Sequence, residues 1–179
     1  MPSPIAHLTA AYVAQRIGLA YVPEPEAETQ RSARRLLLAT AVFSMLPDVD
    51  AVAGALSGDF GSYHNEATHS LLVGAGVSLA FASIMAWRQR GFLFWFLLAA
   101  GCYSAHVLMD SATPGRGVLA AWPISNRRFN APLTLFYGLH WSEGWISVRH
   151  VWTVVTELGF AAVTALVLLV FGRRDRAGE

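Results

Sequence analysis

Long apolar stretches alternate with short polar connections along this chain. A helix needs roughly 20 apolar residues to cross a bilayer, and the stretches that approach or exceed this length span residues 5–22, 35–56, 69–87, 92–109 and 151–171. Helices satisfy their backbone hydrogen bonds internally, as hydrocarbon requires. The pattern predicts an all-α fold: a multi-pass transmembrane helical bundle of about 4–5 membrane helices. We expect residues 1–179 to form a single domain.

Two of these stretches are irregular. Gln15 and Arg16 interrupt the first, so both a spanning and an interfacial placement fit it. In the second, Pro47 bends or ends the helix directly before Asp48 and Asp50. The cleanly apolar part before Pro47 covers only about half of a hydrocarbon core roughly 30 Å thick. The two aspartates are therefore expected to lie recessed below the membrane surface.

The composition agrees with a membrane protein. Hydrophobic residues make up 54% of the chain and charged residues 14%, against about 25% charged residues in ordinary soluble domains. The formal net charge of +1 gives no reason to expect a nucleic-acid partner. We therefore expect the lipid bilayer as the main partner, and the oligomeric state stays open.

The arginines indicate an orientation, because short cytoplasmic loops carry an excess of basic residues. If the helices alternate in direction, one face holds Arg31, Arg34, Arg35, Arg88, Arg90, Arg173, Arg174 and Arg176. The opposite face holds Arg116, Arg127, Arg128 and Arg149, in a much longer loop. The chain is therefore predicted to lie in an inner (cytoplasmic) membrane with its first, Arg-rich face in the cytoplasm.

Residues 111–149 form an exoplasmic connection that is far longer than an ordinary loop. Its aromatic residues are Trp122, Phe129, Phe136, Tyr137, Trp141 and Trp145. Two interpretations are open: an aromatic belt or cap at the membrane interface, and a lid over a functional site.

Residues able to bind a metal or move protons occur in four separate pieces, each at the end of an apolar stretch. They are His7, Asp48 with Asp50, His64 with His69, and His106 with Asp110. Alternating helix directions place all four pieces on the same, exoplasmic side. Ionisable groups in membrane segments are costly and usually functional, so we expect one shared site.

Two of these pieces have a spacing that suits metal ligation. His106 and Asp110 lie one helical turn apart on one face, as two ligands of one metal do, or a ligand and the carboxylate that orients it. Asp48 and Asp50 would repel each other unless a cation lies between them. The alternative for this pair is a solvated turn in which an aspartate caps the following helix.

The remaining pieces are less specific. His64 and His69 supply two imidazoles across a short turn, although an interfacial His69 and a loop His64 are the simpler alternative. Glu66 between them is either a general base or an exposed loop acid. His7 is the weakest candidate, because a lone histidine near a helix start is more often structural.

Together the seven residues exceed the four ligands of a closed structural zinc site, and they fit one or two divalent ions. Nitrogen and oxygen ligands without a thiolate suit zinc most, and also manganese or iron. A divalent metal lowers the pKa of bound water, so hydrolysis is the expected reaction, with Glu66 or Asp50 accepting the proton. Arg127 and Arg128 either bind an anionic group of the substrate or lie at the lipid headgroups.

At these residues the chain resembles the bacterial inner-membrane metal-dependent hydrolases described as YdjM-like or LexA-binding. The matching stretches are His7, residues 46–50 (Leu-Pro-Asp-Val-Asp), 64–72, 106–110, 113–117 (Thr-Pro-Gly-Arg-Gly) and 122–129. One departure is that the family looks like His-Arg-Gly-x-Thr-His where this chain has Asn65 and Glu66 after His64. An arginine that could meet an anionic substrate is therefore missing from this position.

The family is in turn distantly similar to zinc-dependent phospholipase C and the P1-type nucleases, helical enzymes with His and Asp ligands on zinc. That similarity implies phosphoester chemistry, and a recessed site favours a lipid or isoprenoid phosphoester. The leading hypothesis is a membrane-bound metal-dependent hydrolase. The alternative is a non-catalytic membrane protein whose metal site is structural or sensory.

Overall fold

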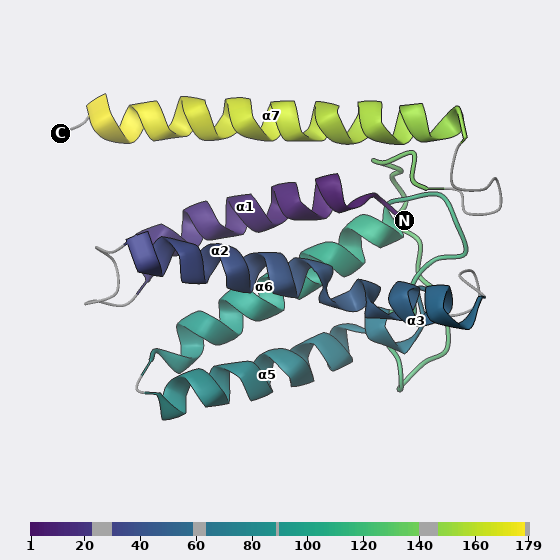
Figure 1. Cartoon of the computed structure of the whole chain (residues 1–179), viewed down its shortest axis with the longest axis horizontal. Helices are drawn as coiled ribbons and strands as arrows, with labels where there is room; N and C mark the ends of the chain where they lie inside the picture. The colour runs from purple at the N-terminus through teal and green to yellow at the C-terminus, as the bar shows by residue number, and fades with distance from the viewer. Residues whose placement is uncertain (23–29, 59–63, 89, 140–146, 178–179) are drawn as a thin grey trace.

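The apolar stretches of the sequence fold into helices that lie alongside one another (Figure 1). The computed structural model describes residues 1–22, 30–58, 64–88, 90–139 and 147–177. In chain order, the helices are α1 (Pro4–Tyr21), α2 (Gln30–Met45), α3 (Val49–Ser57), α5 (Leu71–Trp87), α6 (Phe92–Ser111) and α7 (Arg149–Ala177), with short 3-10 turns η2 (Leu46–Asp48) and η3 (Ala67–His69). An isolated antiparallel bridge joins Val118 and Phe129. The all-α class predicted from the sequence is confirmed.

Three helical stretches are long and apolar enough to cross a membrane: Ser32–Ser57, Phe92–Ser111 and Arg149–Val170. Leu71–Trp87 is a shorter apolar helix, and its 17 residues extend about 26 Å at 1.5 Å per residue. These elements form the predicted helical membrane bundle. α1, the segment interrupted by Gln15 and Arg16, is not one of the three long spans.

α6 is the helix on which α1, α2 and α5 all pack. α5 and α6 approach each other closely at Gly74, where an added Cβ would lie 2.3 Å from Cδ1 of Tyr103. Tyr103 in turn donates its hydroxyl to the carbonyl of Thr68. The glycine therefore sets the helix spacing that holds the turn η3 against α6.

Pro47 breaks the second apolar stretch, as the sequence predicts. α2 ends at Met45, η2 supplies a single tighter turn, and α3 begins at Val49. Proline cannot donate the backbone hydrogen bond that would continue an α-helix. Asp48 and Asp50, which follow the break, are both buried.

The segment after α6 folds back over one end of the bundle. The backbone N–H of Leu71 donates to the Ala120 carbonyl at 3.0 Å, and the N–H of Leu139 donates to the Met1 carbonyl at 2.7 Å. Residues 112–139 are thereby tied to both α5 and the N-terminus.

The aromatic residues of this connection do not share one environment. Phe136 is 2% exposed, and its ring packs against Phe160 of α7 with centroids 5.4 Å apart. Phe129 is 46% exposed. Trp141 and Trp145 lie outside the described residues. The connection is therefore packed into the fold at Phe136 and open to the surroundings at Phe129.

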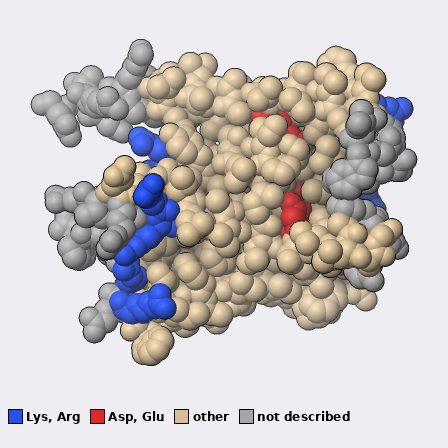
Figure 2. Space-filling view, viewed as in Figure 1, with Lys and Arg blue, Asp and Glu red and all other residues tan. Residues whose placement is uncertain are grey.

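The two ends of the bundle differ in chemistry. The N-terminus, α3 and residues 112–139 lie at one end in Figure 1, and the C-terminus and the α5–α6 connection lie at the other. Figure 2 shows basic atoms gathered at this second end, where Arg35, Arg88 and Arg90 line one groove. The segments that carry the predicted metal ligands meet at the first end.

Replacing Gly74 with alanine tests the α5–α6 contact. Overpacking a tight contact costs typically 1–3 kcal/mol, so Gly74→Ala should lower the free energy of unfolding of the detergent-solubilised protein by about that amount, measured by thermal or denaturant unfolding. Gly76→Ala, on the same helix with open space around the added Cβ, is the matched control and should be neutral or slightly stabilising. Equal stabilities of the two variants would contradict this packing.

Candidate metal centre

Four segments that are distant in the sequence bring their His and Asp side chains together at one end of the bundle. The seven residues predicted for the site, with their exposed fractions, are His7 (0%), Asp48 (8%), Asp50 (7%), His64 (6%), His69 (0%), His106 (1%) and Asp110 (3%). α1, η2, α3, η3, α6 and the turn before η3 each contribute at least one of them. The convergence inferred from helix parity is thus present in the fold.

One set of potential metal ligands comprises Asp48, His64, His69 and Asp110. Oδ2 of Asp110 lies 3.2 Å from Nε2 of His69 and 3.5 Å from Nε2 of His64. Oδ1 of Asp48 lies 3.8 Å from Nε2 of His69. Two ligands of a tetrahedral zinc ion with bonds near 2.0–2.1 Å are separated by about 3.3–3.4 Å, so these spacings are close to those around a single ion.

A second set comprises His7, His106 and Asp110. Oδ1 of Asp110, the other oxygen of the same carboxylate, lies 3.4 Å from Nε2 of His7 and 4.0 Å from Nε2 of His106. The two rings stack with centroids 3.9 Å apart and an interplanar angle of 15°. Asp110 therefore presents one oxygen to each set.

Several of these buried atoms lack a hydrogen-bond partner. Among the described residues, none is a hydrogen-bond partner for either nitrogen of His7, either oxygen of Asp48 or Asp110, or Nε2 of His64. Burying polar groups without partners is costly, and buried carboxylates and imidazoles that face one another are satisfied when a cation lies between them. The donor set therefore fits a divalent metal.

The opposite edges of the rings are held in place by hydrogen bonds. Nδ1 of His106 lies 2.6 Å from the Ser44 carbonyl, which can only accept, so Nδ1 carries the proton and Nε2 keeps its lone pair. Asp50 lies 3.0 Å from Nδ1 of His64 and 3.1 Å from Nδ1 of His69. Such outer partners fix the tautomer and orientation of metal-binding histidines.

This placement separates the roles of the two aspartates that sequence analysis had grouped together. Oδ1 of Asp48 lies 3.5 Å from Nε2 of His106 and 3.8 Å from both Nε2 of His69 and Nδ1 of His64. Asp50 lies closer to the Nδ1 atoms of His64 and His69 and also accepts a hydrogen bond from the hydroxyl of Thr68. Asp50 belongs to neither group of potential ligands. Asp48 lies in the turn η2, which contains Pro47, and Asp50 lies in the first turn of α3, so the two side chains point to different parts of the cluster.

The carboxylates also change the protonation of the two histidines in and before η3. Burial alone would lower the pKa of His69, but the carboxylates of Asp110 and Asp50 beside the ring outweigh it and raise the pKa to about 9. The pKa of His64 is raised as well, because the same two carboxylates lie beside its ring and outweigh its burial. Metal ligation requires neutral imidazoles, so a metal entering here releases protons and binds more weakly as the pH falls.

Glu66, Arg116 and Arg128 form a charged cluster next to the turn that carries His64. Arg116 pairs with Glu66 at 3.1 Å, and Arg128 contacts the same carboxylate. Arg116 also donates to the His64 carbonyl, and Arg128 donates to the Asn65 carbonyl at 3.2 Å. Asn65 adopts a positive φ of 64°, which asparagine tolerates better than most residues. The arginines are therefore fixed to the backbone that carries His64.

The other arginine predicted to bind substrate lies differently. Arg127 is exposed, and its backbone N–H donates to Ser125 Oγ at 3.2 Å. Arg116, which sequence analysis did not select, takes part in the cluster with Glu66. Its position just after the His106–Asp110 helix end was the available signal.

Glu157 of α7 is a second residue that the sequence analysis does not select. It is 0% exposed, and its carboxylate accepts hydrogen bonds from the backbone N–H of Ser3 at 2.6 Å, the N–H of Ala6 at 3.1 Å, and the Ser3 hydroxyl. An anionic side chain at a helix N-terminus satisfies its unpaired N–H groups and its dipole. Glu157 thereby anchors the first turn of α1, directly before His7.

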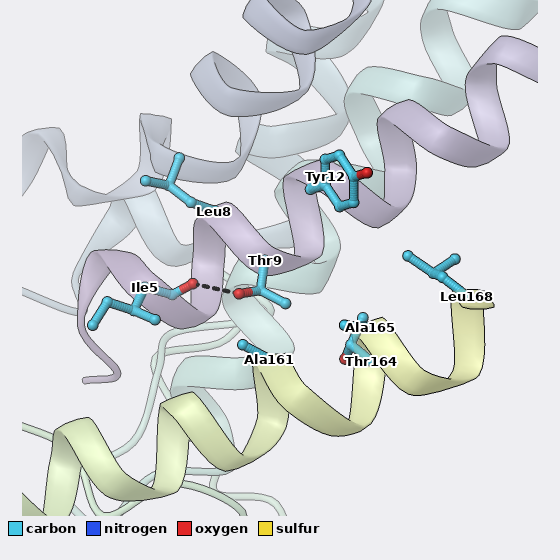
Figure 3. Close-up of a pocket in the computed structure, with 8 residues that line it drawn as sticks. All are labelled: Ile5, Leu8, Thr9, Tyr12, Ala161, Thr164, Ala165 and Leu168. Atoms are coloured by element: carbon cyan, nitrogen blue, oxygen red, sulfur yellow. Dashed lines mark hydrogen bonds between the residues drawn. The ribbon is translucent and has the colours of Figure 1, made fainter. Parts of the chain in front are cut away.

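Further along α1 and α7, most of the residues that line the space between the two helices are apolar. Figure 3 shows Leu8 and Tyr12 of α1 beside Ala161 and Leu168 of α7, lining a shallow groove. The carboxylate of Glu157 is thus a strong polar tie between these helices, and an acidic residue within an apolar helix is the sequence signal that marks it.

Glu157→Gln tests whether this tie positions His7. The neutral amide interacts more weakly with the helix N-terminus, so we expect the second metal set to lose occupancy while the first keeps its ion. Elemental analysis of metal-loaded protein should give two ions per chain for the wild type and about one for His7→Ala and Glu157→Gln. Thr164→Val, on the same helix, is the control and should retain two. Full occupancy in Glu157→Gln would contradict the positioning role.

Comparison with known proteins places the chain in a family. The chain matches the YdjM inner membrane protein family over residues 1–176. The inner membrane protein YbcI of Escherichia coli (strain K12) is 35% identical over 102 residues, which cover 55% of this chain and 59% of YbcI. The match thus spans less than two thirds of that relative. No solved structure matches the chain. The chain belongs to the YdjM inner membrane protein family.

Proposed function

We propose that this chain is a membrane-embedded, metal-dependent hydrolase that acts on an anionic ester, a phosphoester of a lipid or isoprenoid in particular. The observation that carries the proposal is the position of Asp110, whose two oxygens face two different sets of ligands. A carboxylate shared in this way is expected where two divalent ions lie side by side. Paired ions about 3.5–4 Å apart are common in enzymes that hydrolyse phosphoesters.

The donor atoms limit the choice of ion. The ligands are imidazole nitrogens and carboxylate oxygens, a mixture that favours zinc and also suits manganese or iron. A divalent ion held there supplies Lewis acidity and lowers the pKa of a water molecule that binds it. The chain's own part is to hold the ligands, orient them and accept the proton.

Asp48 is the best-placed proton acceptor. Its side chain is 10% exposed, the most open among the proposed ligands, and no described residue forms a hydrogen bond with either of its oxygens. One oxygen suffices for a metal, which leaves the other for a proton. Asp50, engaged by His64, His69 and Thr68, is proposed to orient the imidazoles.

Arg116 and Arg128 are proposed to receive the anionic group of the substrate. Their side chains are 40% and 28% exposed, and both contact the carboxylate of Glu66. Guanidinium groups bind carboxylates and phosphates with the same fork of donors. Glu66 is therefore proposed to occupy the anion-binding position until a substrate displaces it. This role replaces the general-base role that the sequence suggested for Glu66.

The proposed substrate and orientation follow from the membrane setting. The Arg-rich end is proposed to face the cytoplasm, which puts the His/Asp cluster toward the exoplasmic leaflet. His64 and Asp48, the least buried side chains of the cluster, lie in or beside the turn that the two arginines hold. A phosphorylated headgroup could reach this side from the leaflet.

One observation favours the alternative of a structural or sensory metal site. Asp48, His64, His69 and Asp110 supply four buried ligands, the number found in closed structural zinc sites. In that case the ion would clamp α6 to η2 and η3 without turnover. A structural clamp of this kind does not require the second set of ligands, His7, His106 and Asp110.

Hydrolysis assays on the purified, metal-loaded protein separate these functions. The substrates are bis(p-nitrophenyl) phosphate, phospholipids and an isoprenoid diphosphate. We expect a metal-dependent activity that Asp110→Asn abolishes and that Asp50→Asn reduces roughly 10–100-fold, as changes behind metal ligands do. Arg128→Gln should raise KM more than it lowers kcat, and exposed Arg149→Gln serves as the control.

The alternative predicts a different result. In that case the wild-type protein binds metal but hydrolyses none of these substrates, and Asp110→Asn lowers the thermal stability. This result would establish a structural site and refute the proposed activity.

A further inference from the structure

A second concave site lies at the other end of the bundle, between α2 and α5. Both helices pack on α6, and a groove of about 730 Å³ remains between them. Leu38 and Val42 of α2 and Ile84 of α5 line it and are 67%, 47% and 50% exposed. The α2 side belongs to the membrane span Ser32–Ser57, so the groove opens toward lipid.

The groove is closed at one end and charged at the other. Phe43 and Phe81 touch across its inner end with ring centroids 4.9 Å apart, and both line it. Arg35, Arg88 and Arg90 line its outer end. From Arg35 to Phe43 the α2 wall rises about 12 Å at 1.5 Å per residue. A ligand that fills the groove is therefore anionic at one end and apolar along its length.

Trp95 of α6 supplies an independent indication of a ligand. It lines the groove, packs edge-on against Phe81 at 5.7 Å, and is 2% exposed. Its indole Nε1–H has no acceptor among the described residues. Buried indole N–H groups usually find an acceptor, and a lipid ester or phosphate oxygen in the groove would provide one.

We propose that this groove is a binding site for an anionic phospholipid, with the headgroup phosphate on Arg35 and Arg88 and an acyl chain between α2 and α5. Basic residues at a membrane interface attract anionic lipids, and arginine binds phosphate with paired hydrogen bonds. The apolar walls exclude a free inorganic anion as a complete occupant. The site is separate from the His/Asp cluster and does not depend on the proposed hydrolase activity.

Native mass spectrometry of the full chain in detergent tests this site. The protein is titrated with phosphatidylglycerol and with phosphatidylcholine of the same acyl chains. We expect one phosphatidylglycerol to be retained in preference to phosphatidylcholine, and Arg35→Gln and Arg88→Gln each to weaken its binding roughly fivefold. Arg34→Gln removes an exposed neighbouring charge that does not line the groove, and it should leave binding unchanged.

Two further variants test the apolar part. Ala80→Trp fills the groove from its exposed side without changing a charge, and it should abolish preferential retention. Trp95→Phe removes the N–H while keeping the ring, and it should weaken binding.

Three outcomes would overturn the proposal. The first is equal retention of both lipids, and the second is an equal loss of binding in Arg34→Gln, which would indicate general charge attraction. The third is a wild-type protein that is dimeric and carries no lipid adduct, together with an Ala80→Trp variant that is monomeric. This would show that a second copy of the chain covers the groove.

Discussion

The enclosure of Asp110 among four imidazoles is the interaction on which the rest of the arrangement depends. Its carboxylate lies at the end of α6, is 3% exposed and has no hydrogen bond within the described part of the chain, so its charge depends on what the other segments bring to it. His7, His64 and His69 come from three of them. Removing a charge from water without a partner is costly, and a divalent ion is the partner that this geometry accommodates. The break at Pro47, the glycine contact between α5 and α6, and the Glu157 anchor of α1 all serve to bring those segments within reach.

Much of this could be predicted from the sequence. The apolar stretches gave the helical class, and Pro47 predicted the break between α2 and α3. Helix parity was enough to predict that the His and Asp pieces meet, because each piece lies at the end of a helix whose direction is fixed by its neighbours. The one-turn spacing of His106 and Asp110 placed both on the buried face of α6.

The details that the sequence could not supply are those set by side-chain direction and by contacts between distant segments. Asp48 and Asp50 are alike in sequence, yet their positions in η2 and α3 decide that Asp48 belongs to a set of potential metal ligands and that Asp50 lies within hydrogen-bond distance of the Nδ1 atoms of His64 and His69. The pairing of Glu66 with Arg116 joins residues 50 positions apart, and the contact of Glu157 with Ser3 joins residues 154 positions apart. Such pairs depend on tertiary packing: the sequence can mark Glu157 as an unusual acidic residue in an apolar helix, but it does not say which residue Glu157 contacts.

The central claim is that Asp110 lies between two metal positions, and anomalous X-ray scattering from crystals of zinc-loaded protein tests it most directly. Data collected at the zinc absorption edge should show two peaks about 3.5–4 Å apart. One should lie beside His64 and His69, and the other beside His7 and His106, with the Asp110 carboxylate between them. A single peak at this cluster, or no peak within bonding distance of Asp110, would contradict the account.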